Sequence, residues 1–201
     1  VLTLFSGLIL SLIGIPFLFY FENEITPVSS ISIILFSIGL LLVYSSSSIY
    51  HFTLTPELKR KFQVFDHISI YCLILGSYAP VCFITLHNSS GTSIFIAVLT
   101  LTLVGTLKKL FFTGKYQFIS LILYLAMGWL IIFDINSLFK LIDFNAKLLL
   151  ILGGISYTCG VIFYVLGKVK YFHSIWHLFV LIGSGFHYFM SVFYLLGSDA
   201  K

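Results

Sequence analysis

Hydrophobic residues along this chain fall into long unbroken runs that are separated by short polar segments. The runs cover residues 1–21, 28–51, 66–87, 91–107, 117–133, 147–166 and 172–196. Each is close to the ~20 residues that an α-helix needs to cross the ~30 Å hydrocarbon core of a bilayer. None shows the strict alternation of apolar and polar residues that is typical of transmembrane β-strands. The pattern therefore predicts an all-α membrane protein, with a single seven-helix transmembrane domain over residues 1–201.

Composition points to the same class of protein. Hydrophobic residues make up 59% of the 201 residues and charged residues only 9%, and the mean hydropathy is +1.09. Such a chain has too little polar surface to cover a soluble globule. We therefore expect a multi-pass protein of the cell membrane.

Basic residues set the expected orientation of the helices. The segments after the second, fourth and sixth runs hold most of them, namely Lys59, Arg60, Lys61, Lys108, Lys109, Lys115, Lys168 and Lys170. The segments on the other side hold Lys140, Lys147 and Lys201. Cytoplasmic loops carry the excess of Lys and Arg, so we expect a cytoplasmic N-terminus and an external C-terminus. These loops also account for the net charge of +4, which gives no support for nucleic-acid binding.

Two histidines open the last apolar run, His173 and His177 in the segment YFHSIWH. A spacing of four residues puts both rings on one face of a helix, and a histidine inside a bilayer needs a partner. On the expected topology, His51 ends the second run at the same cytoplasmic depth. Three neutral imidazoles and one water form a tetrahedral zinc site with an open catalytic position. The pattern predicts such a site, and the alternative is a set of interfacial histidines that bond carbonyls or lipid headgroups.

Two more polar residues belong to this depth. Asp66 opens the third run and could accept a proton from the water or orient it, whereas the alternative role is a solvated helix N-cap. Ser47 lies one turn before His51 on the same helix face and could bond the water or a substrate oxygen. The alternative for Ser47 is a hydrogen bond to a carbonyl of its own helix, or a small side chain that allows close helix packing. His67 projects about 100° away from Asp66, so we expect it to have at most an indirect role.

Other potential ligands are less well placed. His187 lies about 15 Å further along its helix than His177, too deep in the membrane to join the same metal ion. The three cysteines, Cys72, Cys82 and Cys159, lie within the predicted spans and lack the spacing of a zinc site. We expect the cysteines to serve packing.

Four short motifs occur in register across the chain. They are the SxxxH of Ser47 and His51, the adjacent Asp66 and His67, GSYAP at 76–80 and HSIWHLF at 173–179. Together they resemble the haemolysin III family, which belongs with the progestin and adipoQ receptors and is related to the adiponectin receptors. The resemblance implies a zinc ion held by His51, His173 and His177, with Asp66 at the zinc-bound water and Ser47 close by. It also implies a lipid hydrolase akin to the alkaline ceramidases, with a membrane lipid as substrate.

Three functional classes follow. The first is a zinc-dependent hydrolase of a lipid amide or ester that acts in membrane lipid homeostasis. The second is a pore-forming, cytolytic protein, as the family name indicates, although the polar groups gather at one end of the spans rather than in rings at mid-membrane. The third is a receptor-like regulator with a structural zinc, which would normally have four protein ligands. We favour the hydrolase, and the sequence predicts no particular oligomeric state.

Overall fold

The computed structural model describes residues 2–22, 26–112 and 117–196, and within these ranges the chain is helical and contains no strand. The α-helices are α1 (Leu2–Tyr20), α2 (Pro27–Phe52), α3 (Pro56–Pro80), α4 (Gly91–Phe112), α5 (Gln117–Gly128), α6 (Ile135–Leu141), α7 (Phe144–Val165) and α8 (Phe172–Met190). Three short helical segments continue or join them, namely the π-helical η1 (Val81–Thr85) and η3 (Ser191–Leu196) and the 3₁₀-helical η2 (Leu130–Asp134).

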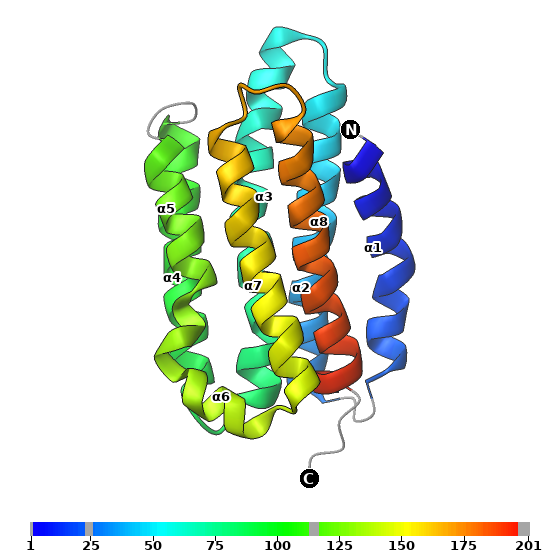
Figure 1. Cartoon of the computed structure of the whole chain (residues 1–201), viewed down its shortest axis with the longest axis vertical. Coiled ribbons are helices and arrows are strands. Elements are labelled where there is room, and N and C mark those ends of the chain that lie inside the picture. Colours follow the sequence, from blue (N-terminus) through cyan, green and yellow to red (C-terminus); the bar gives the residue numbers. More distant parts are fainter. Residues whose placement is uncertain (1, 23–25, 113–116, 197–201) are drawn as a thin grey trace.

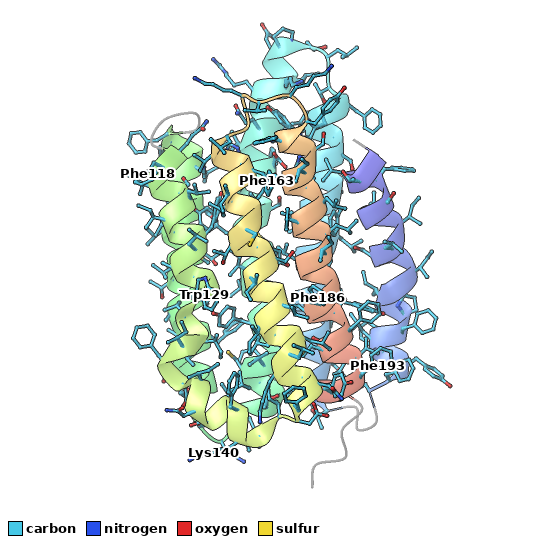
Figure 2. The ribbon with its side chains drawn as sticks, viewed as in Figure 1. Phe118, Trp129, Lys140, Phe163, Phe186 and Phe193 are labelled. Carbon is cyan, nitrogen blue, oxygen red and sulfur yellow. The ribbon has the colours of Figure 1, made fainter. Side chains whose placement is uncertain are left out.

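Seven helical segments of the described chain are long and apolar enough to cross a membrane, which confirms the predicted all-α seven-helix class. The long helices run along the long axis of the molecule, and α1 lies at one edge of the bundle (Figure 1). Large apolar side chains such as Phe118 and Phe193 project outward from the ribbon (Figure 2) and are exposed. An apolar outer surface of this kind suits contact with lipid. The protein is therefore a multi-pass membrane protein, and the direction of insertion remains a prediction.

The helices α2 and α3 pack with their backbones in close contact. A Cβ atom on Gly39 would lie 2.8 Å from the Cys72 carbonyl oxygen, and one on Gly76 would lie 2.6 Å from the Leu35 carbonyl oxygen. Small residues at such crossings let membrane helices approach closely. The approach brings the C-terminal half of α2 alongside the first half of α3, where the polar residues of interest lie.

Local capping fixes where α2 begins. Pro27 occupies the first turn, a position where its missing N–H costs no hydrogen bond. The Thr26 hydroxyl accepts from the Ser29 backbone N–H at 3.1 Å, and the Ser29 hydroxyl accepts from the Thr26 N–H at 3.0 Å. This reciprocal pair is a capping box. The start of α2 is thus set by sequence, and His51 falls in its last turn.

The prediction that α3 starts at Asp66 was wrong. The helix begins at Pro56, ten residues earlier, so Asp66 lies well inside it and is not an N-cap. Hydropathy marked only the apolar part, because the first turns contain the charged residues Glu57, Lys59, Arg60 and Lys61. Pro56 starts the helix instead, in the position that proline favours. Similarly, the fifth apolar run is not one helix, since the chain turns at Trp129 between α5 and η2.

Candidate metal centre

The three histidines singled out in the sequence meet at one end of the bundle, which we call the histidine end. It is formed by the C-terminal end of α2 and the N-terminal end of α8 (Figure 1). His51 Nε2 lies 3.2 Å from His173 Nε2 and 3.2 Å from His177 Nε2, and the last two atoms are 3.0 Å apart. We call this arrangement the histidine triangle. Just before α8, Tyr171 adopts a left-handed backbone conformation with φ 72° and turns the chain into the helix.

Hydrogen bonding alone does not account for the histidine triangle. An imidazole nitrogen is either a donor or an acceptor, so three mutually adjacent nitrogens form at most two hydrogen bonds. The third pair must then oppose two donors or two acceptors. A cation faced by all three lone pairs removes this conflict. Nitrogen ligands at 2.0–2.1 Å around a tetrahedral zinc lie about 3.3 Å apart, close to the separations in the triangle. These residues therefore fit a metal ion.

The metal-ligand group contains three nitrogens. Within the described residues, the ligand atoms that lie within 4.8 Å of one another come from His51, His173 and His177, and no carboxylate or thiolate joins them. His177 is buried and the other two rings are half-buried. A group of three imidazoles leaves one tetrahedral position for an exogenous ligand.

Asp66 and Ser47 lie beside the triangle and are joined to each other. The Ser47 hydroxyl donates to the Asp66 carboxylate, and the side chains are only 4% and 8% exposed. A hydrogen bond within the helix, which was the alternative for Ser47, is seen instead two residues earlier, where the Ser45 hydroxyl donates to the Leu41 carbonyl at 2.5 Å. Ser47 thus links α2 to α3 at the proposed site.

Two cavities that share part of their walls lie at this site and in the interior of the bundle. The first, of about 230 Å³, has walls that include Ser47, Asp66, His173 and His177, and we call it the site cavity. The second, of about 260 Å³, has a mostly apolar surface and we call it the apolar cavity. Both cavities share the four wall residues Val43, Ile70, Trp176 and Val180. The polar site therefore adjoins an apolar space inside the bundle.

The sequence did not predict two residues of the site, His67 and Lys109. His67, which was expected to have at most an indirect role, lines the site cavity. Lys109, which was assigned to a polar loop, is buried in the last turn of α4, and its Nζ lies 3.3 Å from His67 Nδ1. One feature of the sequence could have indicated that Lys109 faces another helix. Gly105 and Lys109 are four residues apart, so a small residue that allows close packing lies on the same helix face as the lysine. By contrast, His187 lines the apolar cavity, away from the metal-ligand group.

Comparison with known proteins identifies the family of this chain. A model of the family described as Haemolysin-III related matches residues 1–188. The Hemolysin-3 homolog of Bacillus subtilis (strain 168) is 35% identical over 189 residues, which cover 94% of this chain and 89% of that protein. Hemolysin-3 of Bacillus cereus is 35% identical over 171 residues, or 85% of this chain and 78% of that protein.

A more distant relative is the human (Homo sapiens) protein named Monocyte to macrophage differentiation factor. It is 26% identical over 173 residues, which cover 82% of this chain and 70% of that protein. No solved structure gives a significant match to the chain. The family match over most of the chain confirms the resemblance seen in the motifs. The chain therefore belongs to the haemolysin III family of multi-pass membrane proteins, within the progestin and adipoQ receptor superfamily.

Proposed function

We propose that this protein is a zinc-dependent hydrolase that cleaves an amide or ester bond of a lipid in the cell membrane. The observation that carries the proposal is the histidine triangle beside a hydrogen-bonded serine and aspartate, in a cavity that adjoins an apolar one. Such a combination offers a metal site, a proton acceptor and room for a hydrocarbon chain. The expected biological role is membrane lipid homeostasis.

The metal would be held by the Nε2 atoms of His51, His173 and His177. Three imidazoles with an open fourth position suit zinc best among the common metals. When bound, zinc supplies Lewis acidity, which polarises a carbonyl oxygen and makes water nucleophilic near neutral pH. A structural zinc normally has four protein ligands, so the three-nitrogen group supports a catalytic role over a purely regulatory one.

Asp66 would accept a proton from the attacking water and return it to the leaving group. As the oxygen of water adds to the carbonyl carbon, the Asp66 carboxylate takes one proton from it. The carboxylate then returns that proton to the leaving nitrogen or oxygen as its bond to carbon breaks, which yields a fatty acid and an amine or alcohol. The Ser47 hydroxyl orients the carboxylate by donating to one of its oxygens. Burial of both groups keeps this geometry fixed.

The apolar cavity supports a lipid as substrate. Its walls include Leu73, Val81, Ile131 and Leu150, and it meets the site cavity at Val180 and the residues shared with it. An acyl chain placed there would have its carbonyl end toward the histidine triangle. The names of the bacterial relatives denote haemolysins, and a lytic pore is the second candidate. An ion pathway needs polar lining, which favours the lipid chain over a pore.

A direct test uses the full chain, purified and placed in lipid nanodiscs. Fatty-acid release from a ceramide and from an ester lipid is measured by mass spectrometry with the zinc-loaded protein, after chelation and after zinc is restored. We expect zinc-dependent release that Asp66→Asn abolishes while the variant still binds zinc. Equal release by Asp66→Asn and wild type, or no release from either lipid, would contradict the proposal.

A further inference from the structure

A lysine is buried inside the bundle next to the site cavity. Lys109 is 2% exposed, and its Nζ lies 3.3 Å from His67 Nδ1. One turn earlier, Gly105 lies against the Tyr71 ring, where a Cβ atom would approach Tyr71 Cε1 to 2.5 Å. Gly105 therefore lets α4 approach α3 closely enough for Lys109 to reach His67. An ionisable side chain at such a place in a membrane protein usually serves function.

His67 is held from three helices. It belongs to α3, its ring contacts Lys109 from α4, and its backbone carbonyl accepts a hydrogen bond from the Tyr124 hydroxyl of α5 at 2.8 Å. The ring lines the site cavity together with Asp66 and His173.

The contact with Lys109 fixes which nitrogen of His67 carries the proton. An ammonium group has three donors and no acceptor, so His67 Nδ1 must accept the hydrogen bond. Burial and the neighbouring Lys108 disfavour the charged form of Lys109, whereas the Asp66 carboxylate, one residue before His67, attracts the ammonium group and favours it. A neutral imidazole that accepts at Nδ1 carries its proton at Nε2. With Nδ1 bonded to Lys109, the remaining polar atom of the ring is an Nε2–H donor, and the residue lines the site cavity.

We infer that His67 is a further catalytic residue whose Nε2–H donates to the oxygen of the scissile carbonyl, and that Lys109 is the positioning residue that fixes this tautomer. The inference rests on the proposed lipid hydrolysis for its substrate, whereas the tautomer is a property of the resting protein. As negative charge develops on the carbonyl oxygen, a fixed donor in the site cavity stabilises it. His67 thus acts alongside Asp66, with one residue stabilising charge and the other moving the proton.

The tautomer is tested by nitrogen NMR of the full chain labelled with ¹⁵N-histidine. The His67 signal, assigned by its loss in His67→Gln, should show a bare Nδ1 and a protonated Nε2. Metal ligands that bind through Nε2 carry the proton on Nδ1, so the two patterns are opposite. Lys109→Met should shift the His67 signal toward a protonated Nδ1, whereas Lys109→Arg, which keeps a donor, should preserve it. A protonated Nδ1 in the wild type, or no change in Lys109→Met, would overturn the inference.

The catalytic role is tested by the kinetics of fatty-acid release. His67→Leu should lower kcat about 100-fold with little change in KM and with zinc content intact. His67→Gln, whose amide N–H can replace the Nε2 donor, should keep kcat within about tenfold of the wild type. His87→Gln, a change in an exposed histidine outside the cavity, serves as the matched control. Equal kcat values for His67→Leu and wild type would overturn the catalytic role. A wild type that hydrolyses no lipid would instead overturn the proposed function, and the spectra would still decide the tautomer.

Discussion

The hydroxyl of Ser47 on α2 donates a hydrogen bond to the carboxylate of Asp66 on α3, although the two residues are 19 positions apart in the chain. His51 lies one turn beyond Ser47 on the same helix. One face of α2 therefore carries both a metal ligand and the group that orients the proposed proton acceptor. The close crossing of α2 and α3 at Gly39 and Gly76 makes this contact possible.

Removal of this hydroxyl should weaken catalysis without removing the metal. We expect Ser47→Ala to lower kcat about tenfold, because partners that orient a catalytic group typically contribute 10- to 100-fold. Zinc content should stay near one per chain. Ser45→Ala is the matched control, since the Ser45 hydroxyl bonds the Leu41 carbonyl of its own helix. The orienting role of Ser47 is wrong if the two variants have the same kcat.

Loss of a ligand should remove the metal itself. We expect His51→Ala and His177→Ala to bring zinc from near one per chain to near zero, because two imidazoles do not complete a zinc site. Asp66→Ala should keep its zinc, since no carboxylate belongs to the described metal-ligand group. Elemental mass spectrometry of detergent-purified protein measures the content. Loss of zinc from Asp66→Ala as well would make the carboxylate a ligand and contradict the three-nitrogen site.

The sequence could predict the histidine triangle because each member is tied to a helix end. His173 and His177 are separated by one helical turn at the start of an apolar run, and His51 closes another run. In a bundle of helices that alternate in direction, the end of one helix and the start of another lie at the same membrane depth. The topology therefore predicts that the three histidines lie near one another. The sequence predicted the membrane depth of Asp66 but not its position inside α3. Hydropathy does not detect the charged first turns of that helix, which precede Asp66.

Lys109 and His67 could not be found in the same way. A lysine pair at the end of an apolar run is typical of a cytoplasmic loop, and only the packing of α4 on α3 shows that Lys109 turns inward. His67 was discounted because neighbouring helical residues diverge by about 100°. The site cavity is wide enough for both Asp66 and His67 to line it. Burial and cavity shape are tertiary properties, which a single-sequence pattern does not contain.

The crossing of α2 and α3 should tolerate no added methyl group. Gly76→Ala would place a Cβ atom 2.6 Å from the Leu35 carbonyl oxygen, and overpacking of this kind costs about 1–3 kcal/mol. We expect a lower Tm in detergent. Gly185→Ala in α8 is the matched control, because nothing lies within 4 Å of its added Cβ atom. An equal Tm for the two alanine variants would show that the crossing is not tightly packed.

Narrowing the junction of the two cavities should discriminate between substrates by chain length. Val180 lines both cavities, so Val180→Phe adds bulk where an acyl chain would pass. We expect kcat/KM to fall at least about tenfold for a long-chain amide, since misplaced substrate is costly, and to change little for a short-chain one. Leu178→Phe, at an exposed position of the same helix, is the control. An equal fall for both chain lengths would contradict an acyl chain in the apolar cavity.

The histidine end should face the cytoplasm, because Lys59, Arg60 and Lys61 begin α3 there. The test uses two cysteine substitutions at opposite ends of the bundle. Leu54→Cys lies at the histidine end, where the native residue is 90% exposed. Asn88→Cys lies at the other end, between η1 and α4. A membrane-impermeant maleimide should label Asn88→Cys on intact cells and Leu54→Cys only after permeabilisation, with the unsubstituted chain as the baseline for its own cysteines. The reverse pattern would place the metal centre on the external side, so that its substrate would have to come from the outer leaflet.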